Sequence, residues 1–328
     1  MAARRLGVDV VFFDPRGVRL ERNQVEGYVP AASGGFRRAV VPLPRAVHKR
    51  GLFRSRRSVD LIHRLEARGV YVFNPQVDWD KYSIYKLLCE EPRLHPYLPE
   101  SALPSPESLE WFRRRLDEGR EMFLKPRRGS LGLGIARIRR ASPGVYHYQT
   151  SKRRRTLSFP GLWRLVKKRG RSSLLQQGIP LLEDGGRRVD FRVPVQKDGE
   201  NRWHVAGIAA KRAARGSFLT NLARGSTPLE GGELLARHFG AARADEIVRE
   251  IFDLAVLVAQ TIHARSPRMV DMGLDVGIDQ SGRPYLIEVN RRDLRVLLEH
   301  SGQRAATKAL YQNPIAYGRY VLEHGLAG

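Results

Sequence analysis

The segment 275–290, with the sequence DVGIDQSGRPYLIEVN, constrains the fold more than any other part of the chain, because its two halves each alternate in polarity. Apolar residues recur at every second position along 274–279 and again along 284–289. The turn Gln280-Ser281-Gly282-Arg283 separates these halves and has the composition of a hairpin loop. We therefore predict an antiparallel β-hairpin with one packed face and one polar face.

A symmetric register across this turn has a chemical consequence. It pairs apolar residues with each other, Leu274 with Val289, Val276 with Ile287, and Ile278 with Tyr285. It also sets Asp275 opposite Glu288, with Asn290 further along the same face. Opposed side chains have Cβ atoms about 4.5–5.5 Å apart, so two carboxylates there need a cation. Mg²⁺ fits, because it prefers oxygen ligands and keeps positions for phosphates. The alternative is a solvated hairpin whose acids pair with nearby arginines.

The charge of the chain indicates an anionic partner. The 328 residues carry a formal net charge of +24, while apolar residues at 42% and charged residues at 28% are ordinary for a globular protein. Such a charge favours association with nucleotide phosphates, an acidic polymer substrate, nucleic acid or anionic lipid. Nucleic acid is the less favoured partner, because the sequence has no zinc-finger spacing or aromatic RNA-recognition motif. Arginine enrichment through genome composition is the alternative explanation.

The cysteine content and hydropathy indicate the cellular environment. A single cysteine, Cys89, excludes an internal disulfide and a cysteine-rich zinc site. The N-terminal sequence lacks the pattern of a signal peptide, and no apolar run reaches the ~20 residues of a membrane-spanning helix. We expect a cytoplasmic protein of two or three compact units. The oligomeric state is left open.

Two domains are predicted, an N-terminal α/β unit at 1–77 and a larger unit at 78–328 that divides near residue 175 into 78–175 and 176–328. In the first unit we expect strands at Val8–Phe13, Ala39–Val41 and Val70–Phe73, and a helix from Ser58 to Gly69. In the second unit we expect helices from Asp80 and Ser105, followed by a strand at Met122–Pro126 and a second strand at Ile135–Ile138. We then expect a basic helical insert at Lys152–Arg171, a strand at Leu174–Ile179 and a hairpin of Val189–Val195 with Trp203–Ala209. The last elements are a helix at Glu246–Arg265 and a final helix starting after Asn313-Pro314. The fold class is thus α/β in the broad sense, and α+β with largely antiparallel sheets in detail.

A glycine-rich loop, GSLGLG at 129–134, is a candidate phosphate-binding segment. Gly132 and Gly134 allow the backbone to approach phosphates closely, and Ser130 adds a hydroxyl donor. The loop is neither a Walker loop nor a dinucleotide fingerprint, because it joins two strands and opens no helix. Lys125 at the end of the preceding strand could reach the α- or β-phosphate. An ordinary hairpin with an exposed lysine is the alternative.

Together these motifs resemble the ATP-grasp superfamily, and within it the YheC/YheD-like branch associated with endospore coats. The resemblance covers most of the chain and implies an ATP-grasp fold with two α+β subdomains behind a small N-terminal α/β domain. It rests on LPRAVHKR at 43–50, DKYSIYKLL at 80–88, FLKPRRGSLGLGI at 123–135, LLQQGI at 174–179, VDFRVPVQKDGENRW at 189–203, KRAARGSFLTNLARGS at 211–226 and LDVGIDQSGRPYLIEVN at 274–290.

The resemblance implies roles for individual residues. Lys81 and Lys125 would grip the ATP phosphates, with Lys86 as an alternative to Lys81. Gln176, Gln177 and Ile179 would contact adenine, and Asp190 would contact ribose, with Glu183 as the alternative. Arg212 and Asn221 would make catalytic contacts near the γ-phosphate and the reacting carboxylate. Asp275, Glu288 and Asn290 would be Mg²⁺ ligands. Two ions are expected, with Mn²⁺ as a substitute and Glu288 as a bridge.

The implied reaction is ADP-forming ligation. ATP activates a carboxylate as an acyl phosphate, and an amine or another nucleophile captures it to form a C–N bond. The chain departs from many superfamily members in following Asn290 with Arg291-Arg292-Asp293, where a small residue and proline are usual. These arginines either recognise an acidic, polyanionic acceptor or are solvent-facing charges. Two other functions stay open: a polyanion-binding or spore-associated protein with an ATP-grasp shell, and a kinase of hydroxyl acceptors.

Overall fold

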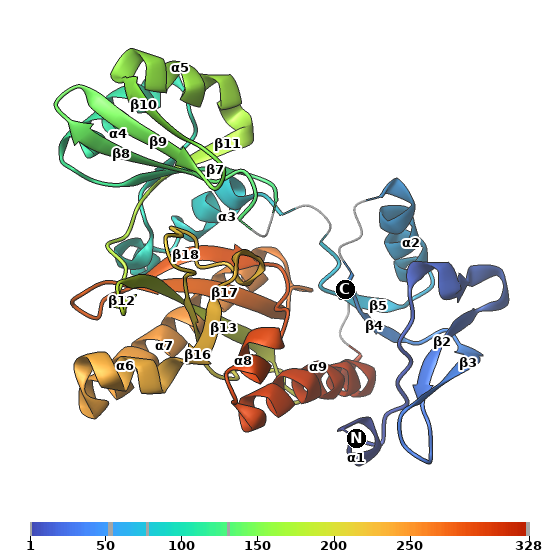
Figure 1. Cartoon of the computed structure of the whole chain (residues 1–328). Coiled ribbons are helices and arrows are strands. Elements are labelled where there is room, and N and C mark those ends of the chain that lie inside the picture. The colour runs from blue at the N-terminus through green and yellow to red at the C-terminus, as the bar shows by residue number, and fades with distance from the viewer. Residues whose placement is uncertain (1, 52–54, 77–78, 130–131, 326–328) are drawn as a thin grey trace.

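The computed structural model describes residues 2–51, 55–76, 79–129 and 132–325 (Figure 1). Its N-terminal part begins with α1 (Ala2–Arg5) and an antiparallel sheet of β1 (Val18–Arg19), β2 (Gln24–Pro30) and β3 (Phe36–Pro42). A parallel pair follows, made of β4 (Ala46–His48) and β5 (Tyr71–Phe73), and α2 (Arg56–Glu66) connects these two strands. The expected strand at 8–13 is wrong, because this segment contributes only the bridge of Phe12 to Tyr28 within the described residues. Extended residues that find no continuous partner strand cannot form a ladder. The helix begins earlier than predicted, because Ser55 caps it by accepting a hydrogen bond from Ser58 N.

The second part of the chain begins with the loop sheet, named here for the glycine-rich loop that it carries. After α3 (Lys81–Leu88), its strands lie in the order β10-β9-β8-β7-β11-β6, all antiparallel. Their bounds are β6 (Ser101–Ala102), β7 (Met122–Pro126), β8 (Ala136–Ser142), β9 (Val145–Thr150), β10 (Arg154–Ser158) and β11 (Ser173–Gln177). Helices α4 (Leu109–Asp117) and α5 (Phe159–Arg169) pack on this sheet through a core that includes Phe112 and Leu162. The basic insert at 152–171 is therefore helical only in its second half, because residues 154–158 pair with β9 as an edge strand.

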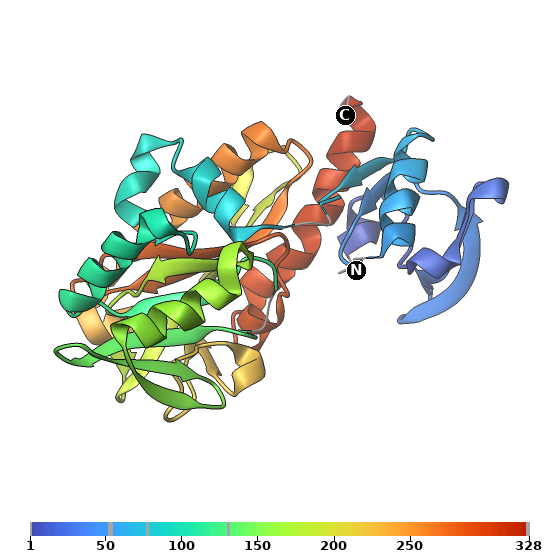
Figure 2. The same ribbon diagram turned by 90° about the horizontal axis from the view of Figure 1, so that it is seen from above.

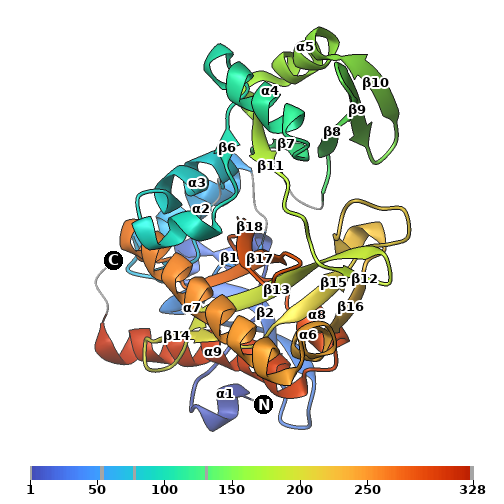
Figure 3. The same cartoon turned by 90° about the vertical axis from the view of Figure 1, so that its left-hand side faces the viewer.

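The central sheet carries the predicted hairpin. Its strands run in the order β16-β15-β13-β17-β18, and β12 and β14 also pair with β13. Their bounds are β12 (Glu183–Asp184), β13 (Arg187–Lys197), β14 (Trp203–Val205), β15 (Ala209–Arg212), β16 (Thr227–Glu230), β17 (Asp271–Ile278) and β18 (Pro284–Asn290). Helices α6 (Gly231–Phe239) and α7 (Ala241–Arg265) cover one face, and the loop sheet stands above the sheet's β18 edge (Figure 3). The apolar residues of β13 and β17 face these helices and leave the polar residues on the other face.

The register of β17 and β18 agrees with the prediction over only half of the hairpin. Leu274 pairs with Val289 and Asp275 with Glu288, as expected. The register then shifts between Asp275 and Val276, so that the remaining predicted pairs are wrong: Val276 pairs with Leu286, Gly277 with Tyr285 and Ile278 with Pro284. A β-bulge adds one residue to one strand and increases the local twist. Here it lies directly beside the two opposed carboxylates.

The last helix joins the two parts of the molecule. After α8 (Val296–His300), α9 spans Arg304–His324 and passes between the N-terminal part and the central sheet (Figure 2). Tyr317 and Val321 of α9 pack with Phe73 of β5 and Val270. The prediction that this helix starts after Asn313-Pro314 is wrong, since Pro314 lies inside α9 and is buried. None of the helices in the described ranges is long and apolar enough to cross a membrane.

Candidate nucleotide and metal site

A line of alternating charges crosses the polar face of the central sheet. Asp190 and Arg192 project from β13 on the face opposite Val189 and Phe191, as the alternation of a strand requires. Lys211 Nζ lies 3.1 Å from Asp190 Oδ1 and 2.6 Å from Asp275 Oδ1. Arg192 Nε lies 3.2 Å from the same oxygen of Asp275. Acidic and basic side chains thus alternate along this line of contacts, in the order Asp190, Lys211, Asp275 and Arg192.

These contacts set the ionisation of the acids. Burial favours a neutral Asp275, but Arg192 and Lys211 outweigh burial and hold the pKa of Asp275 below its usual value. Burial also lowers the pKa of a lysine, yet Asp190 and Asp275 outweigh it and raise the pKa of Lys211. For Asp190, burial dominates and raises its pKa, although Lys211 opposes the shift. The protein itself therefore supplies the cations that repulsion between opposed carboxylates requires, and repulsion alone does not demand a metal.

The candidate metal ligands nevertheless lie together. Asp275 and Glu288 are cross-strand partners, and Asn290 Nδ2 donates to Asp275 Oδ2 at 3.1 Å. Within the described ranges, no group of three or more His, Cys, Asp and Glu side chains is arranged to hold a metal ion. The donor set of two carboxylates and one amide oxygen still fits Mg²⁺, which is typically held by one or two carboxylates together with substrate phosphates.

Two lysines reach the same pocket from the other side. Lys81, the first residue of α3, has Nζ 3.6 Å from Glu288 Oε1 and donates to Gly129 O at 2.8 Å. Lys125 at the end of β7 is buried and donates to Gln176 Oε1. Burial lowers the pKa of Lys125 to about 8, although Glu288 opposes this shift. Lys86, the alternative to Lys81, is exposed. The pocket combines these groups with apolar walls: its lining is Lys81, Lys125, Gln176, Glu288, Ile84, Tyr85, Leu88, Leu98, Leu174, Leu286, Ile287 and Val289.

The glycine-rich loop leans toward the segment that follows β15. Gly132 and Gly134 have φ values of +66° and +73°, the left-handed region that favours glycine. A Cβ placed on Gly132 would lie 3.4 Å from Leu219 and 3.8 Å from Asn221. The loop and Asn221, predicted separately, are thus neighbours. Ser130, predicted as a phosphate donor, lies outside the described residues.

The connection between the two sheets contains the predicted adenine contacts. Gln176 belongs to β11, receives the hydrogen bond of Lys125 and donates to Ser101 Oγ at 3.2 Å. Gln177 N donates to Glu100 O at 2.8 Å, and Ile179 lies in the connection that leaves the sheet after β11. The side chain of Gln176 is therefore oriented at both ends, while Gly178 N donates to Glu121 O at 2.6 Å.

Three other predicted residues lie in different surroundings. Asp190 is buried and accepts a hydrogen bond from Thr220, whereas its alternative, Glu183, is exposed on β12. Arg212 follows Lys211 on β15 and so points to the opposite face, where its Nη1 lies 2.6 Å from Asp184 Oδ2. Lys211, which the sequence interpretation left without a role, is the β15 cation that contacts Asp275.

Arg192 and Lys211 are the site residues that the sequence analysis missed. The signal was present, because Asp190 and Arg192 alternate with apolar residues along the predicted strand. Pairing of β13 with both β15 and β17 was needed to show that Lys211 lies opposite Asp190 and Arg192 opposite Asp275. Such pairing joins segments distant in sequence, which periodicity alone cannot align.

Comparison with known families supplies the assignment. A family model described as YheC/D like ATP-grasp matches residues 69–321. The chain belongs to this family. Among its relatives is the endospore coat-associated protein YheD of Bacillus subtilis (strain 168), 26% identical over 328 residues that cover 96% of this chain and 71% of that protein. The endospore coat-associated protein YheC of the same organism is 22% identical over 252 residues, covering 74% of this chain and 67% of that protein.

Solved structures support the ATP-grasp fold. D-cycloserine synthetase DcsG has a TM-score of 0.51 at 15% identity, covering 97% of this chain and 91% of that chain. D-alanyl-alanine synthetase A from Vibrio cholerae O1 biovar eltor str. N16961 has a TM-score of 0.50 at 14% identity, covering 96% and 84%. The predicted ATP-grasp fold, α+β with mostly antiparallel sheets, is confirmed.

Proposed function

We propose that this YheC/D-like ATP-grasp protein is an ATP- and Mg²⁺-dependent ligase that activates a carboxylate. One observation carries the proposal: Lys81 and Lys125 from one side, and Glu288 and Asp275 from the other, converge beside one pocket. Lysines attract phosphates, whereas carboxylates repel them unless a divalent cation intervenes. A nucleoside triphosphate with its bound metal is a ligand that would contact both the lysines and the carboxylates.

The residues around the pocket would each contact a different part of Mg²⁺-ATP. Lys81 and Lys125 hold phosphate oxygens, and the loop containing Gly132 and Gly134 covers them. The Gln176–Ile179 connection contacts adenine. Asp275, Glu288 and Asn290 would hold Mg²⁺, which neutralises charge on the phosphates when bound.

The electrostatic contacts assign a further role to Lys211. This residue and Arg192 keep Asp275 ionised, and an ionised carboxylate is the form that binds metal. Asn221 is adjacent to the loop and would meet the terminal phosphate or the reacting carboxylate. Arg212 would reach the terminal phosphate or the reacting carboxylate only by breaking its ion pair with Asp184. We therefore give Arg212 a positioning role, in which it holds Asp184 on the opposite face of the sheet.

The proposed reaction transfers the γ-phosphoryl group of ATP to a carboxylate oxygen, releasing ADP and forming an acyl phosphate. An amine then attacks the acyl carbon, a C–N bond forms, and inorganic phosphate leaves. The chain contributes positioning and charge neutralisation, which are the main catalytic devices for phosphoryl transfer. A nucleophilic side chain is not needed for this sequence of steps.

Binding of Mg²⁺-ATP by calorimetry tests the assignment. Glu288→Gln, at a half-buried position, should weaken binding at least about tenfold, because loss of a charge-assisted contact of about 1.5–3 kcal/mol corresponds to that change or more. Asp275→Asn should do the same, and Glu233→Gln, at an exposed position of α6, is the matched control. Unchanged Mg²⁺-ATP affinity in both Asp275→Asn and Glu288→Gln would refute the site.

A polyanion-binding protein without turnover is the second candidate, favoured by one observation. Asp275 already has Lys211 and Arg192 as counter-ions, so the charge balance of the site is satisfied by the protein. Incubation with Mg²⁺-ATP and pools of acids and amines, with ADP release and adduct masses followed together, separates the candidates. ADP with an adduct mass supports ligation, and ADP with a phosphorylated hydroxyl supports a kinase. Turnover in none of the pools supports binding alone.

A further inference from the structure

The guanidinium group of Arg192 lies between two buried acids. On one side, Nε is 3.2 Å from Asp275 Oδ1 and Nη2 donates to Asp275 Oδ2 at 3.4 Å. On the other side, Nη1 is 3.6 Å from Asp293 Oδ1. Asp275 is a candidate metal ligand on β17, whereas Asp293 belongs to the loop that follows β18. One cation is therefore shared between the candidate metal site and a carboxylate outside it.

The contact of Arg192 with Asp275 is looser than an arginine–carboxylate pair can be. Such pairs often consist of two parallel contacts with N–O distances of about 2.7–2.9 Å. Arg188 forms a pair of this kind with Glu121, at 2.6 and 3.1 Å. In contrast, Nε of Arg192 makes no hydrogen bond within the described part of the chain, although its ion pair with Asp275 is at 3.2 Å. The guanidinium group thus stays short of a full two-point contact with Asp275.

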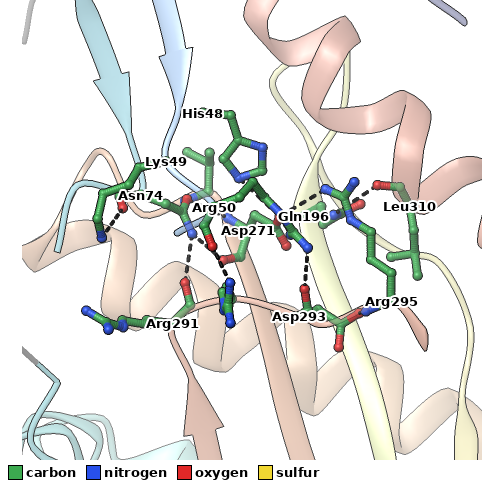
Figure 4. Close-up of polar contacts among 12 residues, drawn as sticks. His48, Lys49, Arg50, Asn74, Gln196, Asp271, Arg291, Asp293, Arg295 and Leu310 are labelled. Atoms are coloured by element: carbon green, nitrogen blue, oxygen red, sulfur yellow. Dashed lines mark hydrogen bonds and ion pairs between the residues drawn. The ribbon is translucent and has the colours of Figure 1, made fainter. Parts of the chain in front are cut away.

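Asp293 is held in place by its own loop and by the N-terminal part. Its exposed fraction is 1%, and Figure 4 shows it beside Arg50 and Arg295. Arg295 N donates to Asp293 Oδ2 at 2.6 Å, and Arg50 Nη2 donates to Asp293 O at 2.7 Å. The other carboxylate oxygen, Oδ1, is the one nearest to Arg192. A buried carboxylate fixed at this position attracts Nη1 in competition with Asp275.

Gly273 leaves the space into which Arg192 extends. This glycine lies on β17, two residues before Asp275. A Cβ built on it would overlap Nη1 of Arg192 and lie 3.0 Å from Asp293 Oδ1. Gly273 is not among the glycines with positive φ, so its backbone conformation does not require glycine. The missing side chain is instead required by the position of the guanidinium group.

We propose that Asp293 is a positioning residue for the candidate metal site: it draws Arg192 over Gly273 and so keeps Asp275 open to Mg²⁺. The inference rests on the proposed function, in which Asp275 binds the metal. Arg192 still supplies positive charge beside Asp275, but it does not close on the carboxylate. Because Arg50 holds the backbone of Asp293, the N-terminal part contributes to this arrangement.

The number of acceptor sites on Asp275 explains why this restraint matters. An ionised carboxylate offers about four lone-pair sites. Lys211, Asn290 and Nη2 of Arg192 already donate to Asp275. A closed two-point contact from Arg192 would use a fourth site, and Mg²⁺ would then have to displace the arginine. Sharing of the guanidinium group with a second acid leaves that site for the metal.

The metal dependence of ATP binding tests the proposal by calorimetry of the full chain. We define the metal effect as the ATP dissociation constant in EDTA divided by that in Mg²⁺. Asp293→Asn should lower the metal effect about 10–100-fold, as is typical when a group that orients a metal ligand is changed. The dissociation constant in EDTA should stay within about twofold, because Asp293 does not line the nucleotide pocket. An unchanged metal effect would overturn the proposal.

The same substitution in a chain without Arg192 separates positioning from a general structural role. In the Arg192→Gln background, Asp293→Asn should change the metal effect by less than about twofold, because no guanidinium group is left to restrain. A merely structural role of Asp293 would lower the metal effect equally in both backgrounds. Equal losses would therefore contradict positioning through Arg192.

Gly273→Ala carries the test if Asp293→Asn does not fold. Its Cβ would displace Nη1 of Arg192 from β17, so the metal effect should again fall at least about tenfold. This variant changes no charge. A metal effect in Gly273→Ala equal to that of the wild type would count against the proposal.

Gly207→Ala is the matched control for the glycine variant. Its Cβ would lie 2.8 Å from side-chain atoms of Gln303 and Leu298, neither of which is a site residue. Crowding is thus similar, but Arg192 is not displaced, and the metal effect should stay within about twofold of the wild type. Equal losses in Gly207→Ala and Gly273→Ala would show that crowding alone causes the effect, and the proposal would fail.

The wild-type measurement separates this inference from the proposed function. A wild-type chain that binds ATP equally well in Mg²⁺ and in EDTA would refute the proposed function, and with it the role of Asp293. A wild-type chain with a clear metal effect that Asp293→Asn and Gly273→Ala both retain would refute the role of Asp293 alone.

Discussion

Lys211 Nζ lies 2.6 Å from Asp275 Oδ1, so the acid of the candidate metal motif on β17 is held by a buried lysine of β15, on the far side of β13. The same ammonium group lies 3.1 Å from Asp190. The ammonium group of Lys211 thus forms ion pairs with two buried carboxylates. This arrangement predisposes Asp275 to remain ionised, which is the form required for binding a divalent cation.

Removing Lys211 should destabilise the protein strongly. Lys211→Met leaves two buried carboxylates with one fewer counter-ion, and breaking a buried pair in this way typically costs about 3–5 kcal/mol. Urea unfolding measures the loss. Lys197→Met is the matched control, because Lys197 is also buried but donates to the neutral Asn201; it should cost about 1 kcal/mol. Similar losses in both variants would contradict the role of Lys211.

The contribution of the Lys211–Asp275 pair itself can be isolated. The double variant Lys211→Met/Asp275→Asn removes both charges, so its loss of unfolding free energy should be smaller than the sum of the two single losses, by at least about 1 kcal/mol. Urea unfolding of all four proteins provides the cycle. Additive losses would show that the 2.6 Å contact contributes little.

The lowered pKa of Lys125 predicts how stability depends on pH. In the unfolded chain Lys125 titrates near 10.5, whereas in the folded protein burial lowers its pKa to about 8. The unfolded state therefore binds more protons between these pH values, and the cost of the buried charge, fully present below about pH 8, is relieved as pH rises. Wild-type stability should increase more from pH 8 to 9.5 than that of Lys125→Met. Unfolding at both pH values measures this difference, and parallel slopes would contradict it.

The loop glycines can be tested with a matched glycine elsewhere. Gly134→Ala introduces a Cβ 2.9 Å from Pro126 Cγ at a residue with φ +73°. Gly144→Ala has nearly the same φ, +74°, with nothing within 4 Å, and should cost about 1–2 kcal/mol for the left-handed backbone. Gly134→Ala should cost about 1 kcal/mol more, because the neighbouring proline must shift. Chemical unfolding compares them, and equal losses would show that the contact with Pro126 is unimportant.

The buried Asp271 predicts an acid limit to stability. Burial favours its neutral form, but His48, Arg295 and Arg50 outweigh burial and lower the pKa of Asp271. Its stabilising contribution is therefore present above about pH 4, the unfolded pKa, and is lost as pH falls through the folded pKa. Asp271→Asn should cost about 3–5 kcal/mol at pH 7, and less at low pH. Urea unfolding at both pH values provides the test, with Asp245→Asn at an exposed position of α7 as the control. A loss of stability that does not change with pH would contradict this role of Asp271.

Local pattern determined much of the site. Alternation along 274–290 located the hairpin and correctly opposed Asp275 and Glu288. Helical periodicity likewise located α3 and α7, because a 3.6-residue stripe of apolar side chains depends only on neighbouring residues. These features require no knowledge of distant segments.

Only the tertiary structure decided which distant groups meet. The bulge after Asp275 changed half of the predicted register, and Pro314 lies within α9, where packing on the N-terminal part outweighs the helix-breaking tendency of proline. The pairing of Lys211 with Asp275, and the contact of Arg192 with Asp293, join segments far apart in sequence. Periodicity reports the face on which a side chain lies. Strand order and domain packing determine what that side chain contacts, since both depend on the whole chain.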